Sequence, residues 1–203
     1  MTIQTPLQPK PLFVQIPDDI ALKVTPEQFT ALAAANRDLK LERTATGELI
    51  VNPPTGGESG KRNLSISGQL SNWFEAHDTL GEAFDSSIGF ELPNGANRSP
   101  DASWVRKERW EALTLEQREG FVPLCPDFVV ELHSKTDSLT GLRAKMQEYM
   151  ENGAQLGWLI DPSTKQVEIY RAGQTVEVLE NPNMLSGEAV LPGFTLTLKR
   201  ILN

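Results

Sequence analysis

The chain has 203 residues, of which 39% are hydrophobic and 23% are charged, and its formal net charge is −8. This length suits one well-packed domain, and no run in the sequence approaches the roughly 18 apolar residues that a membrane span needs. The acidic balance argues against a protein that coats nucleic acid tightly and non-specifically through a basic surface.

The N-terminal segment and the cysteine content bear on organisation and location. Residues 1–24 begin with a Pro-rich stretch without periodicity, so we expect an extended arm ahead of a single domain over residues 25–203. The arm has no basic region followed by an apolar stretch, which is not the pattern of a signal peptide. The only cysteine is Cys125. One cysteine cannot form an internal disulfide or a zinc cluster, so a cytoplasmic location is expected.

The first predicted helix begins at Thr25-Pro26-Glu27-Gln28. Thr25 suits the N-cap position, Pro26 suits the first turn, and Gln28 completes a capping box. This helix is expected to run to about Asn36. The chain then continues with a predicted hairpin of strands at residues 39–43 and 48–52 and a Pro- and Gly-rich breaker segment at residues 53–60.

Apolar residues at helical spacing predict the second helix, over residues 63–76. Ile66, Leu70, Trp73 and Phe74 occupy positions i, i+4, i+7 and i+8 of this stretch, which is typical of an amphipathic helix. Short apolar runs and helical turns follow. They predict strands at residues 83–84, 89–92 and 102–105, two short helices at residues 108–113 and 115–119, and a strand at residues 128–132.

The second half of the chain predicts the centre of the sheet. The run at residues 128–132 is apolar on both faces except at Glu131, which is the pattern of a central strand. A helical stripe from Leu139 to Met150 follows, and Gly153 ends it at a C-cap position. The remaining predicted elements are a strand at residues 156–160, a hairpin of residues 167–170 and 176–179, and a final strand at residues 194–198. Together they predict an α/β fold with a mixed sheet flanked by helices and additional antiparallel hairpins.

Two acidic residues stand out as candidates for chemistry. Asp101 follows Pro100, which lacks an N–H and suits the start of a strand. Glu131 lies in an otherwise apolar strand, where a carboxylate needs a cation, a basic partner or several hydrogen-bond donors. Two carboxylates on neighbouring strands, with the carbonyl of Leu132, would hold one hard cation. This pattern suits metal-assisted phosphodiester cleavage, with a nearby lysine that neutralises charge in the transition state.

Five short stretches around this pair carry a family resemblance. They are Leu92-Pro93-Asn94-Gly95, Arg98-Ser99-Pro100-Asp101, Pro126-Asp127-Phe128-Val129-Val130-Glu131-Leu132, Lys145-Met146-Gln147-Glu148-Tyr149 and Gly157-Trp158-Leu159-Ile160-Asp161-Pro162. In this order they resemble the Uma2 family of restriction-endonuclease-like proteins, and the similarity covers nearly the whole chain from about Thr25. That family is similar to the PD-(D/E)xK nucleases. The resemblance therefore implies a restriction-endonuclease-like fold and a metal-dependent DNA endonuclease with Asp101 and Glu131 as metal ligands.

The catalytic lysine departs from the simplest form of that motif. A plain E-x-K pattern would place lysine at position 133, where His133 stands, and Lys135 lies past the predicted strand end. Helical spacing places Arg143 and Lys145 on the two sides of the apolar stripe, and this geometry does not choose between them. The resemblance points to Lys145.

The resemblance also implies a third acidic residue, a cation and partners. Glu42, in a Leu-Glu pair before a turn, is expected to join the site, and Asn63 stands where the family often has a histidine. The implied cation is Mg²⁺, with Mn²⁺ as an alternative. The implied substrate is DNA, and a homodimer is expected by analogy because two strands need two cuts.

Two other functions remain open at this point. The acidic balance and His133 are compatible with a catalytically inactive module that retains the nuclease fold to bind DNA or protein. A different phosphoesterase or small-substrate hydrolase would use the same pair of carboxylates.

Overall fold

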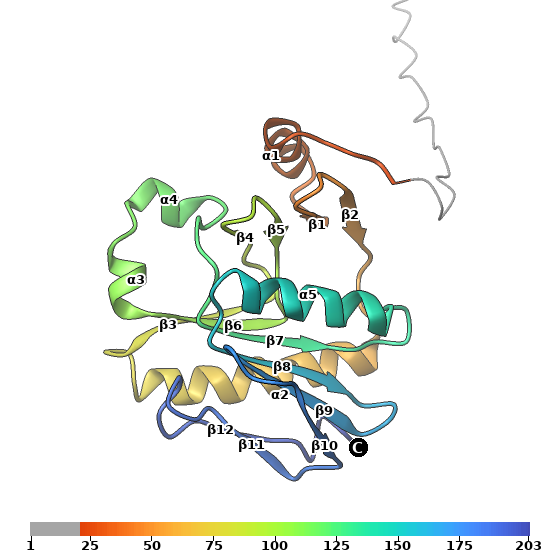
Figure 1. Cartoon of the computed structure of the whole chain (residues 1–203), viewed down its shortest axis with the longest axis vertical. Helices are drawn as coiled ribbons and strands as arrows, with labels where there is room; N and C mark the ends of the chain where they lie inside the picture. Colours follow the sequence, from red (N-terminus) through yellow and green to blue (C-terminus); the bar gives the residue numbers. More distant parts are fainter. Residues whose placement is uncertain (1–20) are drawn as a thin grey trace, which may run out of the picture.

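The structure is a computed structural model that describes residues 21–203 (Figure 1). Residues 1–20 of the predicted arm lie outside the described residues. The last residues of the arm join the first hairpin, since Val24 N donates to Gly47 O at 2.8 Å and Leu49 N donates to Leu22 O at 2.7 Å. No helix between residues 21 and 203 has the length and apolar character needed to cross a membrane.

The described chain alternates helices and strands. The helices are α1 (Pro26–Ala35), α2 (Gly57–Glu75), α3 (Lys107–Glu111), α4 (Leu115–Glu119) and α5 (Leu139–Glu151). The strands are β1 (Lys40–Arg43), β2 (Leu49–Asn52), β3 (Gly81–Asp85), β4 (Phe90–Glu91), β5 (Asn97–Arg98), β6 (Ala102–Arg106), β7 (Phe128–Leu132), β8 (Leu156–Asp161), β9 (Gln166–Arg171), β10 (Glu177–Glu180), β11 (Met184–Ser186) and β12 (Thr195–Thr197).

The main sheet has six strands in the order β10-β9-β8-β7-β6-β3. The pair β7 and β8 is parallel, and the other neighbours in this sheet are antiparallel. A smaller sheet of order β2-β1-β5-β4 lies beside α1 and above α5 in Figure 1, and β11 pairs with β12 in a separate hairpin. The predicted mixed sheet with added antiparallel hairpins is therefore confirmed, and β7 lies inside the sheet as its apolar sequence indicates.

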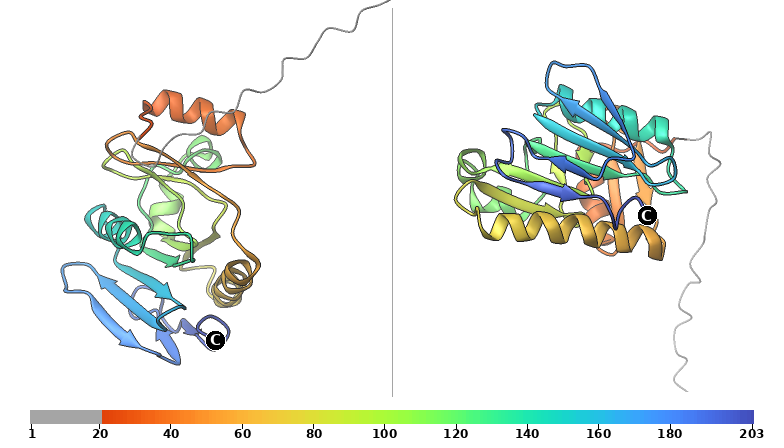
Figure 2. Two further views of the ribbon diagram at one scale, coloured as in Figure 1. Left: turned by 90° about the vertical axis from the view of Figure 1, so that its right-hand side faces the viewer. Right: turned by 90° about the horizontal axis from the view of Figure 1, so that it is seen from below.

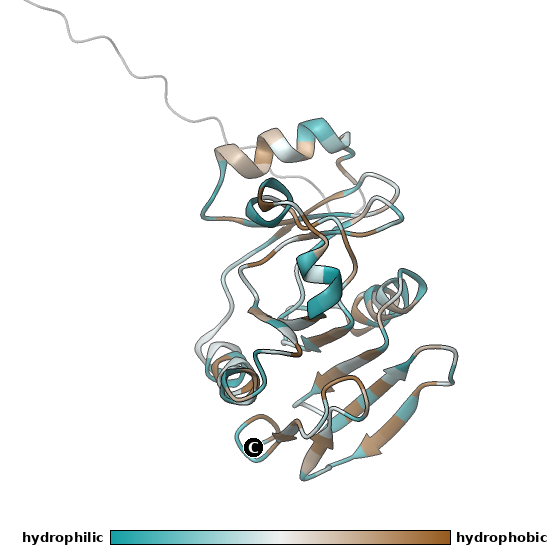
Figure 3. Ribbon diagram, turned by 90° about the vertical axis from the view of Figure 1, so that its left-hand side faces the viewer, coloured by the Kyte–Doolittle hydropathy of each residue, from teal (hydrophilic) through white to brown (hydrophobic). Residues whose placement is uncertain are grey.

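Helices α2 and α5 cover opposite faces of the main sheet (Figure 2). The strands present alternate residues to the two faces, because successive side chains of a strand point to opposite sides. On β7, Phe128, Val130 and Leu132 pack in the cluster that contains the buried residues of α2. Val129 instead packs with Met146 and Tyr149 of α5. Figure 3 shows hydrophobic positions along the strands between these layers.

The start of α2 differs from the prediction. The helix begins at Gly57 rather than near Asn63, so the prediction that residues 57–60 interrupt regular structure was wrong. Glu58 lies in the first turn, where an acidic side chain is favourable. Its carboxylate pairs with Lys61 at 2.8 Å and lies 3.8 Å from Arg62. These pairs, one turn apart on the helix surface, favour the helix despite its glycines.

Candidate active site

The Asp101 carboxylate lies at the end of β7 that carries Glu131. Asp101 directly precedes β6, and the first residue of β6, Ala102, pairs with Val130 of β7. A backbone hydrogen bond also joins the two segments, because Asp101 N donates to Val130 O at 3.0 Å. The side chain is held as well, because Leu132 N donates to Asp101 Oδ2 at 2.9 Å. The structure therefore brings the two predicted carboxylates together.

Glu131 is a buried carboxylate that faces α5. Strand alternation places it on the same side of the sheet as Val129, against the helix, and only 3% of the residue is exposed. Its Oε1 atom lies 2.8 Å from Lys145 Nζ and accepts a hydrogen bond from the Tyr149 hydroxyl at 3.1 Å. Lys145 and Tyr149 are four residues apart on α5, so both reach the same spot.

Lys145 joins the two sheets by contacting a second buried glutamate. Its ammonium lies 2.8 Å from Glu42 Oε1 and donates to Ser99 O at 3.3 Å. Glu42 comes from β1 of the smaller sheet and also accepts from Ser99 N at 3.1 Å and from Arg98 at 3.3 Å. Strand β5 pairs with both β1 and β4 and thereby holds Glu42 over the site.

The two glutamates that contact Lys145 differ in protonation. Burial alone would raise the pKa of Glu42, but Lys145 and Arg98 outweigh burial and lower that pKa. Burial also raises the pKa of Glu131 to about 7, and the nearby charges of Asp101 and Glu42 add to the effect against the attraction of Lys145. Burial would lower the pKa of Lys145, yet Glu131 and Glu42 raise it above its usual range. Lys145 is therefore charged at neutral pH, while Glu131 binds a proton readily.

These side chains enclose a cavity of about 100 Å³, which we call the carboxylate cavity. Its lining includes Lys40, Glu42, Asn63, Asp101, Glu131, Leu132 and Lys145. Asn63 Nδ2 approaches Asp101 Oδ1 at 3.4 Å, whereas the buried Asn63 Oδ1 has no hydrogen-bond partner among residues 21–203. Lys40 Nζ lies 3.7 Å from the same Asp101 oxygen.

The donor set of the carboxylate cavity fits a hard divalent cation. The groups that line this small space include the carboxylates of Asp101 and Glu131, one unpartnered amide oxygen and Leu132, and Mg²⁺ prefers oxygen ligands together with water. Within the described part of the chain, no three acidic, histidine or cysteine side chains are grouped closely enough to form a metal cage by themselves. A cation here would thus rely on the amide, the backbone and water to complete its coordination.

Several other candidate residues lie elsewhere. Arg143 pairs with Glu168 at 2.6 Å, and half of its side chain is exposed. His133, at the position of the plain motif's lysine, lies 3.1 Å from Asp161. Asp127 stabilises the other end of β7. Of the two basic residues on α5 that helical spacing could not separate, the structure brings Lys145 to Glu131 and leaves Arg143 outside.

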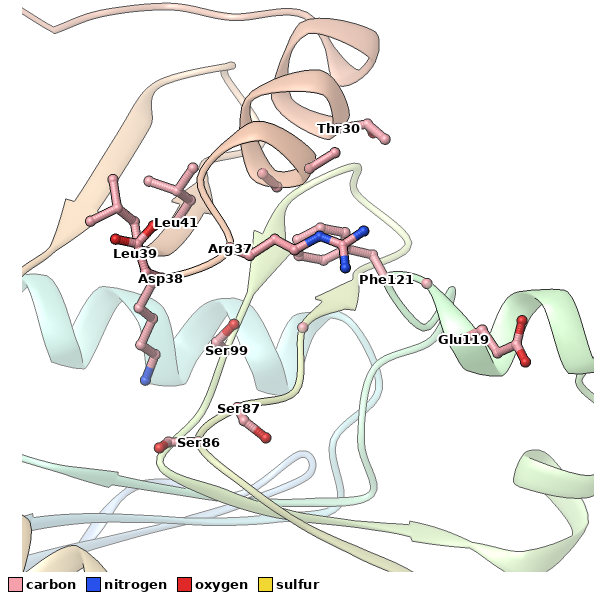
Figure 4. Close-up of a pocket in the computed structure, with 15 residues that line it drawn as sticks. Thr30, Arg37, Asp38, Leu39, Leu41, Ser86, Ser87, Ser99, Glu119 and Phe121 are labelled. Atoms are coloured by element: carbon pink, nitrogen blue, oxygen red, sulfur yellow. The ribbon is translucent and has the colours of Figure 1, made fainter.

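The sequence did not identify Tyr149 and Lys40 as parts of the site. Tyr149 has the pattern of a core residue because its ring belongs to the apolar stripe of α5, and its hydroxyl contact with Glu131 needs the folded packing. Lys40 also lines a second cavity, of about 620 Å³, beneath α1. Figure 4 shows this cavity with Arg37, Ser99 and Phe121 among its walls.

Comparisons with known proteins identify a family and similar solved structures. The profile of the Uma2 family, described as "Putative restriction endonuclease", matches residues 26–199. A crystal structure from Anabaena variabilis ATCC 29413, described as "a putative nuclease belonging to DUF820", is 21% identical with a TM-score of 0.67 and covers 80% of this chain and 89% of that chain. A cryoEM structure of a DrdV–DNA complex is 15% identical with a TM-score of 0.36, over 63% of this chain and 78% of that chain. No curated protein matches the sequence. The likeness to the Anabaena structure confirms the predicted fold class.

Proposed function

This chain belongs to the Uma2 family, and on that premise we propose that it is a metal-dependent endonuclease that hydrolyses phosphodiester bonds in DNA. The observation that carries the proposal is the gathering of Asp101, Glu131 and Lys145 around one small cavity. Burying a carboxylate is costly, and groups with perturbed pKa values in a cavity mark functional sites. The pKa of Glu131, raised to about 7, meets this description.

The residues that would hold the cation are Asp101, Glu131 and the Leu132 carbonyl, with Asn63 Oδ1 as a further oxygen. We propose Mg²⁺ as this cation and Mn²⁺ as a substitute, because the donors are all oxygens. When bound, such a cation supplies positive charge that polarises a phosphate and makes water more acidic.

The chain's own groups would hold the site in one arrangement before substrate arrives. Leu132 N fixes the Asp101 carboxylate, and the Tyr149 hydroxyl fixes Glu131. Lys145 remains protonated between the two glutamates, and its ammonium would exchange one of its three present acceptors, Glu42, Glu131 and Ser99 O, for a phosphate oxygen as negative charge develops there. Donors placed in advance stabilise a transition state without reorganisation. Glu42 would act through Lys145, because it holds the ammonium in place.

A second candidate function is a nuclease-fold module without catalysis. The observation that favours it is the ion pairing of Lys145, whose ammonium lies 2.8 Å from both Glu42 and Glu131. Such pairing balances the buried charges in the absence of any cation, so the cluster would also serve as a structural support. The two functions differ in whether the carboxylates are needed for cleavage.

Incubation with supercoiled plasmid separates these functions. We expect nicked and linear DNA in Mg²⁺ or Mn²⁺ and a loss of at least about a hundredfold in rate for Asp101→Asn and Glu131→Gln. Arg143→Met is the matched control, since Arg143 lies on α5 but pairs with Glu168. Absence of cleavage by the wild type in both metals, or undiminished cleavage by the carboxylate variants, would refute the proposed catalysis. Duplex cleavage also leads us to propose a homodimer, which sedimentation would test.

A further inference from the structure

A basic recess opens beside the carboxylate cavity. It has a volume of about 690 Å³ and lies between the first turns of α2 and the segments after β7 and β8. Its walls include Gly56, Arg62, His133, Lys135 and Ser163. The recess and the carboxylate cavity share three wall residues, Ser59, Ser134 and Thr136, so the two spaces adjoin. Figure 1 shows the start of α2 and the segment after β7 at the same end of the main sheet.

The recess carries a local surplus of positive charge in a chain of net charge −8. Arg62 and Lys135 are its cations, and its acidic residue, Glu58, is already paired with Lys61 at 2.8 Å. Glu58 also forms a weaker ion pair with Arg62, at 3.8 Å, which is beyond hydrogen-bond distance. Lys135 forms no ion pair with any residue in the described range of 21–203.

Arg62 also carries an unused donor. Its Nε atom is buried and has no hydrogen-bond partner among the described residues. A buried donor without an acceptor is costly, so Arg62 gains from any acceptor that its guanidinium can reach. The hydroxyl of Ser59 lies on the same wall, while the Ser163 hydroxyl donates to Asp161 Oδ1 at 2.6 Å and the hydroxyls of Ser134 and Thr136 bond to each other at 3.0 Å.

We infer that the basic recess binds a phosphodiester group of the nucleic acid, next to the phosphate that would be cleaved at the carboxylate cavity. The inference rests on the proposed nuclease function, because it assigns the recess to the same substrate strand. Arginine and lysine are the side chains that recognise phosphate, through a planar fork and a point charge respectively. The shared wall of serine and threonine residues lets one strand reach both spaces.

The first test removes the two cations. Binding of the double variant Arg62→Ala/Lys135→Ala to a fluorescein-labelled DNA duplex is followed by fluorescence anisotropy over a range of salt concentrations. A chelator is present to remove divalent cations, so the duplex is not cleaved during the measurement. We expect affinity to fall about tenfold or more and the slope of log K against log salt to decrease by about one, because the two cations together would neutralise the one phosphate in the recess. Lys107→Ala, on α3 and outside the recess, serves as the control and should leave the slope unchanged.

The second test adds a negative charge without harming the fold. Gly56 is the N-cap of α2, its φ is −66°, and nothing lies within 4 Å of an added Cβ. Aspartate is favoured at this position, so Gly56→Asp should fold at least as stably as the wild type yet bind DNA several-fold more weakly. Thr114→Asp, at the N-cap of α4, adds the same charge away from the recess and should bind normally.

The combined results separate the two proposals. If wild type cleaves plasmid and both recess variants bind and cleave like wild type, the recess inference is overturned and the nuclease proposal stands. If wild type neither cleaves nor binds DNA, the nuclease proposal fails and the recess inference fails with it. Weaker binding by both recess variants, with normal binding by both controls, supports the inference.

Discussion

Replacing Lys145 with methionine tests whether the buried ion pairs have the energies that their geometry indicates. The substitution keeps a long apolar stem but removes the ammonium that lies 2.8 Å from both Glu42 and Glu131. Both glutamates stay buried, at 2% and 3% exposure. Removing one partner of a buried ion pair costs about 3–5 kcal/mol. We therefore expect the free energy of unfolding of the metal-free protein at pH 8 to fall by about 3 kcal/mol.

The destabilisation in Lys145→Met should depend on pH. Without the ammonium, the folded-state pKa of Glu42 rises above its unfolded-state value, and the pKa of Glu131, already raised to about 7, rises further. A carboxyl group whose folded-state pKa is raised stabilises the fold at low pH, and this stability is lost as the pH rises through the folded-state pKa. The destabilisation should consequently be large at pH 8 and shrink to about 1 kcal/mol near pH 5, where both carboxyls take up protons.

Urea unfolding, followed by tryptophan fluorescence at both pH values, gives the required free energies. The control is Lys107→Met, because Lys107 is 40% exposed and lies 4.0 Å from Glu111. An exposed pair contributes little, so this variant should stay within about 0.5 kcal/mol of wild type. A decrease of less than about 1 kcal/mol at pH 8 for Lys145→Met, or an equal decrease at both pH values, would refute the reasoning.

Three further predictions follow from other contacts of the site. Burial and neighbouring carboxylates raise the pKa of Glu131 to about 7, so Mg²⁺ affinity measured by calorimetry should be about tenfold weaker at pH 6 than at pH 8; equal affinities would contradict this pKa. Tyr149→Phe removes the hydrogen bond to Glu131 and should lower the free energy of unfolding in urea by about 1 kcal/mol; wild-type stability would show that this bond contributes nothing. Asp127→Asn breaks a 3.0 Å ion pair with Arg109 at the opposite end of β7, so it should lower the melting temperature but leave plasmid cleavage per folded molecule unchanged; a hundredfold slower cleavage would place Asp127 in the catalytic machinery.

Local sequence patterns predicted the elements that carry Glu131 and Lys145. The apolar run at residues 128–132 identifies a central strand, and the stripe from Leu139 to Met150 identifies the helix that follows it; both are present as β7 and α5. Periodicity also shows that Glu131 interrupts an apolar face. It does not show which basic residue of α5 reaches that face, because Arg143 and Lys145 flank the stripe and the choice depends on how the helix is rotated against the sheet.

The contribution of Glu42 depends on pairing between distant segments. Glu42 enters the site because β1 pairs with β5, which is a strand of only two polar residues, Asn97 and Arg98. No apolar pattern marks such a strand, and the sequence did not predict it. Arg98 is nevertheless buried, since it bonds to both Glu42 and Glu148. At Arg98, ion pairing rather than hydrophobic burial stabilises the strand, and hydrophobic periodicity therefore does not reveal it.

The start of α2 shows a further limit of local patterns. Its glycines predict a break in structure, but the helix extends to Gly57 and thereby forms one wall of the basic recess. The first turn is stabilised by the ion pairs of Glu58, which are possible only once the helix exists. The Gly and Pro content of residues 53–60 therefore predicted a break in regular structure, although residues 57–60 form the first turn of a helix that ion pairs stabilise.

Titration of the full-length protein with Mn²⁺ in a calorimeter tests the central claim, that Asp101 and Glu131 together hold a divalent cation. We predict a saturable site in the wild type and in Arg143→Met, and a decrease of at least about tenfold in affinity for both Asp101→Asn and Glu131→Gln. Melting temperatures measured alongside would show that each variant is folded. Binding by the two carboxylate variants as tight as that of the wild type, or no binding by the folded wild type, would contradict the claim.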